Sequence, residues 1–229
     1  MPTLADPYVT KYGGAPALSA DYDAVGALSW GASVTLTEDD SDGLQEEDTF
    51  TVGVVTFLTA RLDPLLPELL DAISGDMAAF APLFDQDFIV DELQEQFEDS
   101  YPAGILILDQ AHLHPAVRGH DLGAWSVAQI INNMTFGRDL LVLTHPSPPG
   151  EQNLPETELR RAQNHLARYW EKAGLVRLDA APHLMGQSTV YTRLDEARAA
   201  LTPVAEVRIE VDVAAMAELR RGWSPSRRA

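Results

Sequence analysis

Cysteine is absent from the 229 residues of this chain, and that absence excludes several chemistries at once. No disulfide framework, thiolate nucleophile or cysteine-ligated metal can form. Long apolar runs are missing as well, since none approaches the roughly 18 residues of a membrane-spanning helix. The N-terminal segment has no cationic stretch followed by an apolar one, so it lacks the pattern of a secretory signal. We therefore expect a cytoplasmic protein with no membrane partner.

Basic residues are nearly missing from the first half of the chain. Residues 1–110 hold 22 acidic residues against two basic ones, Lys11 and Arg61, a net charge of −20. Residues 111–229 hold 13 acidic and 14 basic residues, a net charge of +1. A field this negative disfavours nucleic acid, whose binding depends on neutralised phosphates, and attracts amines or basic peptide segments instead. The simpler interpretation, that the acidity serves only solubility, stays open.

The first half of the chain combines a predicted hairpin with a helical region. Residues 1–27 show no clear period and are expected to form an irregular arm. Two runs rich in Val, Thr and Phe, 28–37 and 50–62, predict strands joined by an acidic loop. From 64 to 97 the apolar residues recur at helical spacing and predict three helical pieces.

The second half alternates strand and helix patterns. Helices are expected at 121–136 and 156–173, with a short one near the C-terminus. Apolar and β-branched runs predict strands at 104–115, 140–144, 175–178, 189–194 and 207–213. Such alternation favours a mostly parallel or mixed sheet flanked by helices. The fold class is therefore α/β (α+β), with residues 1–229 forming a single domain.

The most informative segment is the loop that joins the strand at 104–115 to the helix at 121–136. A glycine-containing turn at a helix N-terminus presents free N–H groups and the positive end of the helix dipole, which suits a pyrophosphate. Its glycines let the backbone approach a ligand closely, and its arginine adds a permanent cation. An ordinary strand-to-helix turn is the alternative. The candidate residues are Arg118, Gly119, His120, Asp121, Gly123 and Ala124.

Two motifs in order resemble the GNAT superfamily of acyl-coenzyme A-dependent N-acyltransferases. The family hallmark is a strand ending in hydrophobic-x-Pro, here Leu113-His114-Pro115, followed by Arg/Gln-x-x-Gly-x-Gly/Ala at a helix start, here residues 118–123. A buried strand and a second helix then follow, and the helix ends in a Tyr-Glu-Lys-x-Gly-Phe-like sequence, here YWEKAGL at 169–175. The resemblance covers roughly residues 104–194.

The resemblance implies a GNAT-like central mixed sheet flanked by helices. It places an acyl-coenzyme A-binding core at 104–194, between an atypical acidic hairpin-plus-helix region at 1–103 and a C-terminal extension at 195–229. The implied activity is an N-acetyltransferase that moves an acetyl group from acetyl-coenzyme A to a primary amine of a small molecule or basic peptide. The amine attacks the thioester directly, a base removes its proton, and backbone N–H groups of the central strand polarise the carbonyl. A homodimer stays open.

Asp109 is the candidate base. Strand alternation predicts that it shares a face with Ile107, Ala111 and Leu113, which we assign to the reaction centre. Desolvation in an apolar strand would raise its pKa and suit it to base chemistry. The alternative is a structural carboxylate paired with arginine or backbone.

The remaining candidate contacts to coenzyme A come from the central strand and the second helix. The resemblance assigns the loop residues named above to the phosphates, and backbone groups of Ala111 and Leu113 to the pantetheine arm. Two positions depart from the family. Asp121 stands at the central glycine and adds negative charge, although an aspartate there can instead cap the helix. Trp170 stands where the family has its general-acid tyrosine.

An indole cannot protonate a departing thiolate. Tyr169, about 100° around the helix from Trp170, is therefore the second catalytic candidate. Trp170 is assigned either to the core or to a shelf for the cofactor. These departures keep open a catalytically degenerate GNAT-fold binding or regulatory module.

Two further alternatives remain from the residue pattern. His112 and His114 form a His-x-His pair that can bind zinc, but no third ligand lies nearby in the sequence, so no metal site is predicted. An interaction protein whose acidic half grips a basic partner is the third functional hypothesis.

Overall fold

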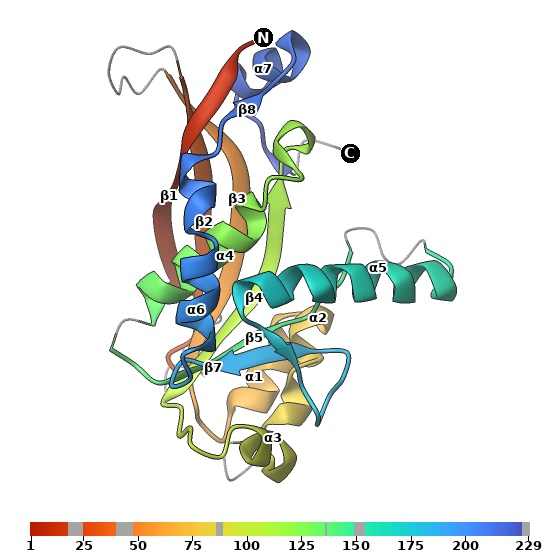
Figure 1. The fold of residues 1–229 in the computed structure, drawn as a ribbon. Coiled ribbons are helices and arrows are strands. Elements are labelled where there is room, and N and C mark those ends of the chain that lie inside the picture. The colour runs from red at the N-terminus through yellow and green to blue at the C-terminus, as the bar shows by residue number, and fades with distance from the viewer. Residues whose placement is uncertain (18–24, 40–47, 86–88, 136, 149–153, 226–229) are drawn as a thin grey trace.

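An eight-stranded mixed sheet forms the centre of the computed structural model, which describes residues 1–17, 25–39, 48–85, 89–135, 137–148 and 154–225 (Figure 1). The strand order is β6-β7-β5-β4-β3-β2-β1-β8. Neighbours are antiparallel except β4 and β5, which are parallel. The mixed α/β class is confirmed. The strands are β1 (Thr3–Pro16), β2 (Leu28–Glu38), β3 (Thr49–Arg61), β4 (Gly104–Leu113), β5 (Leu140–Thr144), β6 (Val176–Arg177), β7 (Met185–Ser188) and β8 (Ile209–Glu210).

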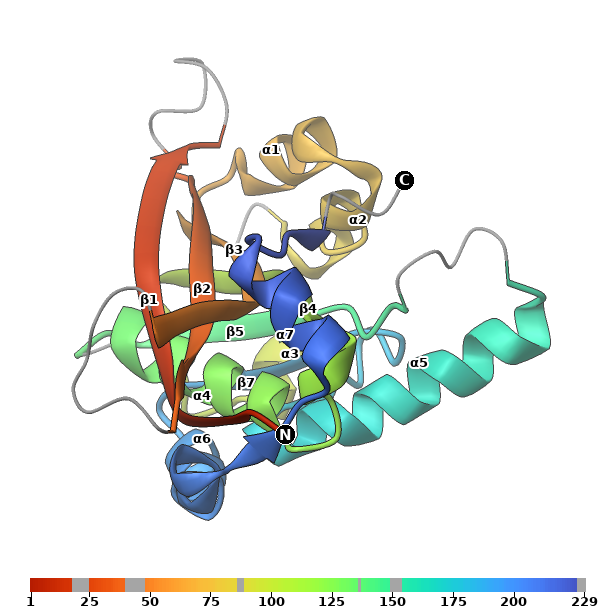
Figure 2. The same ribbon diagram turned by 90° about the horizontal axis from the view of Figure 1, so that it is seen from above.

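Helices cover both faces of the sheet, and each face has its own buried core (Figure 2). One layer contains α1 (Leu66–Ile73), α2 (Gly75–Ala78) and α3 (Asp91–Gln96). The other contains α4 (Leu122–Met134), α6 (Arg193–Ala200), α7 (Val213–Arg220) and the C-terminal end of α5 (Glu156–Trp170). None of the helices in the described part of the chain combines the length and apolar content that crossing a bilayer requires.

Most elements of the predicted order are present near their expected bounds. The predicted hairpin is confirmed as β2 and β3, while its acidic loop falls largely on residues 40–47, outside the described residues. The helical region forms α1, α2 and α3 with a 3₁₀ turn at Ala81–Leu83. The motif-bearing elements β4, α4, β5 and α5 lie where the periodicity and the turn residues put them.

Two predictions about strands are wrong. Residues 1–27 do not form only an irregular arm, because β1 spans Thr3–Pro16. Its pairing with β2 shifts register twice, and such bulges interrupt the two-residue alternation that marks a strand in a sequence. The strand expected at 189–194 is a turn leading into α6, which begins at Arg193. The residue types at 189–194 favour a strand, but the packing of the surrounding chain determines the structure there.

The central strand β4 contains a bulge at Asp109. On β3, Thr56 pairs with Gln110 and Phe57 pairs with Leu108, so Asp109 has no opposite residue. A bulge inserts one residue and reverses the inside-outside alternation beyond it.

The bulge overturns the expected shared face of β4. Ile107 packs with the core under α1, α2 and α3, whereas Ala111 and Leu113 pack against the core under α4. The prediction that these three residues share one face with Asp109 is therefore wrong.

The parallel strands β4 and β5 separate partway along their length. Their pairing begins at Gly104 and ends where Leu108 lies opposite Thr144. Beyond that point β4 continues to Leu113 beside β3, while the chain after β5 enters a loop that contains Pro146 and Pro148. The two strands therefore part at the bulge.

Gly104 is required by the close approach of β3 at the start of β4. A Cβ atom at this position would overlap the carbonyl oxygen of Ala60, which is fixed in the sheet. We expect Gly104→Ala to lower the free energy of unfolding by roughly 1–3 kcal/mol, measured by urea denaturation. Gly31→Ala is the matched control, because a Cβ atom there meets nothing within 4 Å. Equal effects of the two substitutions would contradict this account.

Candidate active site

A cavity of about 320 Å³ occupies the space between the separating strands. One wall is β4 from Leu108 to His112, and the opposite wall is Thr144, His145 and the loop that follows. Trp170 at the end of α5 and Met77 of α2 line it from the two helical layers. The cavity is therefore open to a ligand that lies along β4.

Asp109 lies at the rim of this cavity, where the bulge turns it away from the regular strand pairing. Its Oδ2 accepts a hydrogen bond from Thr56 Oγ1 at 3.0 Å. Desolvation raises the pKa of the carboxyl, and the negative charge of Asp76 raises it further, while the Thr56 hydroxyl and His112 oppose the shift. The side chain is nevertheless exposed at the cavity rim, and its raised pKa makes it a stronger base than an aspartate of ordinary pKa.

The backbone of β4 presents an open edge to the cavity. The His114 N–H donates to Val52 O at 2.8 Å, so strand alternation directs the polar groups of Leu113 and Ala111 away from β3. Beyond Leu108, no described strand pairs with that edge. The N–H of Ala111 can therefore donate to a ligand, whereas the carbonyl of Leu113 accepts from Arg118 Nε at 3.1 Å.

The glycine-containing loop at the start of α4 holds two residues in left-handed conformations. Gly119 has φ 88° and Asp121 has φ 57° and ψ 12°. Aspartate is one of the few residues that tolerate this conformation, which explains how it replaces the central glycine of the motif.

Asp121 makes no side-chain capping bond, so the alternative that it caps α4 is wrong. Its carboxylate instead accepts from Lys172 Nζ at 2.7 and 2.8 Å. The lysine offsets much of the negative charge that Asp121 brings to the loop.

Tyr169 and Trp170 point to different places although they are neighbours on α5. The Tyr169 hydroxyl accepts the Ala124 N–H at 2.9 Å, at the N-terminal end of α4. Desolvation raises the pKa of this hydroxyl. Trp170 lines the cavity, and its ring centroid lies 5.1 Å from that of Tyr169. The structure therefore puts the indole in the cavity that Asp109 borders, and the phenol on one of the N–H groups expected to bind phosphate.

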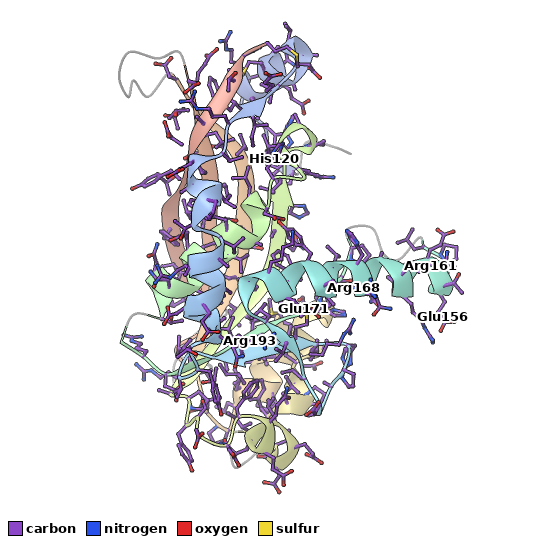
Figure 3. The ribbon with its side chains drawn as sticks, viewed as in Figure 1. His120, Glu156, Arg161, Arg168, Glu171 and Arg193 are labelled. Carbon is purple, nitrogen blue, oxygen red and sulfur yellow. The ribbon has the colours of Figure 1, made fainter. Side chains whose placement is uncertain are left out.

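Of the other predicted loop residues, Arg118, Gly119 and His120 are exposed, whereas Gly123 and Ala124 are buried in the first turn of α4. His120 lies in the loop between β4 and α4 (Figure 3), and Arg118 of the same loop is also exposed. Arg118 uses its Nε to hold the end of β4, which leaves its two terminal nitrogens to contact an anion. Both side chains therefore border the N-terminal end of α4.

His112 and His114 have separate surroundings. His112 Nε2 lies 2.9 Å from Gln110 Oε1 at the cavity wall. His114 is buried, its Nδ1 accepts the Ala116 N–H at 3.2 Å, and its ring centroid lies 5.7 Å from that of Trp223. Among the described residues, no three acidic or histidine side chains group as metal ligands would.

Sequence reasoning missed four residues of the site: Thr56, Asp76, His145 and Lys172. A signal existed for His145, because it directly follows the buried strand β5 just as Asp109 follows the paired part of β4. Side chains at the carboxyl ends of neighbouring parallel strands gather at one edge of a sheet. Nothing in the sequence pattern marks the other three, because their roles depend on contacts between distant segments.

Comparisons with known proteins give little beyond the chain's own geometry. No family model matches the sequence, and no curated protein matches it. Among solved structures, the crystal structure of a point mutant of KacT aligns with a TM-score of 0.37 at 11% identity, over 75% of each chain. At this level the likeness assigns neither fold nor activity to the present chain.

Asp121 offers a direct test of the loop. Glycine adopts the left-handed conformation freely, so Asp121→Gly should keep the backbone and lose only the exposed pair with Lys172, which costs roughly 0–1 kcal/mol. Removing the negative charge should tighten acetyl-coenzyme A binding about fivefold, measured by calorimetry. Asp121→Asn, which also tolerates this conformation, should tighten it similarly. Weaker binding in both variants would show that the loop does not face the phosphates.

Proposed function

We propose that this protein is an acyl-coenzyme A-dependent N-acyltransferase that moves an acetyl group to a primary amine. The observation that carries the proposal is the separation of β4 from β5. It leaves a cavity with an open backbone edge on one side and a carboxylate of raised pKa at its rim. A thioester needs such N–H donors for its carbonyl oxygen, and an amine needs such a base.

The order of elements also supports the proposal. Strand, glycine-containing loop, helix, strand and helix follow one another as β4, the loop, α4, β5 and α5, as the GNAT resemblance requires. The pantetheine arm lies along Ala111 and Leu113, and the pyrophosphate lies at the loop residues 118–124. Trp170 packs against the arm near the thioester. Residues 104–194 thus form the acyl-coenzyme A-binding core.

The reaction needs one base and one route for the second proton. Asp109 takes a proton from the ammonium, and the free amine nitrogen bonds to the carbonyl carbon while the oxygen is held by N–H groups of β4. The C–S bond breaks, and the thiolate takes the second proton from the attacking nitrogen. Asp109 then returns its proton to water. The products are the N-acetyl amine and free coenzyme A, with one proton released per ammonium consumed.

Two measurements test the proposal. Calorimetry with acetyl-coenzyme A should show binding at a single site. Gly123→Glu should abolish it, because its side chain displaces the Tyr169 hydroxyl and adds negative charge in the first turn of α4. Turnover is followed as release of free thiol from coenzyme A across a panel of primary amines. The absence of cysteine means that the protein itself contributes no thiol background. A folded protein that binds no acetyl-coenzyme A would overturn the proposal.

The role of Asp109 as the base predicts how the rate of acyl transfer depends on pH. The rate should rise with pH as the carboxyl ionises, with a midpoint above the ordinary aspartate value of 3.8 because desolvation raises its pKa. Asp109→Asn should remove this limb and lower the rate about 10²-fold or more, with acetyl-coenzyme A affinity unchanged. Thr56→Val is the matched variant. It deletes the hydrogen bond that lowers the pKa, so the limb should persist and move to higher pH.

A second candidate function is a binding module that holds acyl-coenzyme A without turnover. The observation that favours it is the pair on α5: the indole of Trp170 lines the cavity and the Tyr169 hydroxyl is bonded to Ala124. Among the described residues that line the cavity there is therefore no phenol to protonate a departing thiolate. If the wild-type protein binds acetyl-coenzyme A and transfers nothing, Trp170→Tyr decides the case. If the Trp170→Tyr variant gains turnover, the protein is a degenerate enzyme. If the variant still transfers nothing, the protein is a binding module.

A further inference from the structure

A second cavity, of about 310 Å³, adjoins the first at Asp109. The two cavities share four lining residues: Asp76, Met77, Asp109 and Gln110. The first cavity extends toward β5 and α5, whereas the second extends toward β2, β3 and the layer of α1 and α2. Two reactants that entered separately would therefore meet at the bulge in β4.

The lining of the second cavity combines apolar side chains with two carboxylates. Leu58, Ile73 and Met77 give it an apolar wall, whereas the ring of Phe57 packs with Tyr12 and Trp30 in the core on the other face of the sheet. The hydroxyl-bearing residues are Ser29 and Ser74, of which Ser74 is occupied as the cap of α2 through the Met77 N–H. None of its described lining residues is basic. This chemistry suits a ligand with an apolar body and a single positive charge.

Asp76 and Asp109 flank the junction of the cavities from different elements. Asp76 lies in the first turn of α2, and Asp109 in the bulge of β4. The negative charge of Asp76 raises the pKa of Asp109, so the two carboxylates repel one another across this gap. An ammonium placed between them relieves that repulsion and is attracted by both.

We propose that the second cavity is the acceptor site and that the acceptor is a small primary amine with an apolar body, its ammonium held between Asp76 and Asp109. This inference rests on the proposed function and narrows it from amines in general to hydrophobic monoamines. Asp76 anchors the ammonium, and Asp109 takes one of its protons. The apolar body packs against Leu58, Ile73 and Met77, where the second charge of a polyamine would be desolvated without a partner.

The binding test uses the whole protein without acetyl-coenzyme A, so that it does not depend on turnover. We expect calorimetry to show that 2-phenylethylamine binds, while its neutral analogue 2-phenylethanol binds at least threefold more weakly. Asp76→Asn should weaken 2-phenylethylamine binding roughly threefold to fivefold, the scale of a partly exposed ion pair. Asp71→Asn is the matched control. That aspartate is exposed on α1, lines neither cavity, and should leave the affinity unchanged.

The turnover test compares acceptors with acetyl-coenzyme A present. 2-Phenylethylamine should be preferred over spermidine and over a lysine-rich peptide, and Asp76→Asn should raise its KM with little change in kcat. Asp76-dependent binding without any acyl transfer would uphold the site and overturn the proposed function. Transfer that prefers spermidine and is unaffected by Asp76→Asn would uphold the function and overturn this site. Failure of 2-phenylethylamine to bind, or equal binding of 2-phenylethanol, would also overturn it.

Discussion

The loss of hydrogen-bond pairing between β4 and β5 beyond Leu108 and Thr144 is the constraint from which the rest of the site follows. A continuous parallel pair would satisfy the backbone of β4 on both edges and leave no space between the strands. Because β5 ends in a proline-containing loop, the outer edge of β4 stays open and a cavity forms beside it. The bulge at Asp109 occurs at the same point, so the unpaired edge and the carboxylate arise together.

Much of the fold was predictable, because its strongest elements carry their signal locally. A local pattern of a few residues indicates strand or helix for three elements: the apolar run of β4, the periodic apolar face of α4 and the short apolar run of β5. β1 was missed because two register shifts break its alternation, and a register shift is a property of two strands together. The face of β4 on which Asp109 lies could not be predicted either, because the bulge is a property of the pairing between β4 and β3.

The site was predictable to a lesser degree. The glycine-containing loop is visible in the sequence, and the GNAT resemblance implies a role for the backbone of Ala111. The partner of Asp121 was not predictable, since Lys172 lies 51 residues away. Asp76 could not be foreseen either, because its place beside Asp109 depends on how the layer of α1 and α2 packs against the sheet. Residues that act through contacts between distant segments produce no periodic pattern in the sequence. Most of the site residues that only the structure reveals are of this kind.

Helix α5 extends away from the body of the protein, with Glu156 and Arg161 toward its far end, and Ala167 is its one fully buried residue among those described (Figures 1 and 3). Its inner end carries Tyr169 and Trp170 in sequence, the first bonded to α4 and the second in the cavity. Consecutive residues of a helix cannot turn independently. Any rotation of α5 that frees the Ala124 N–H therefore also moves the indole within the cavity. Force applied to the projecting end of α5 would therefore act on the N-terminal end of α4 and on the cavity at once.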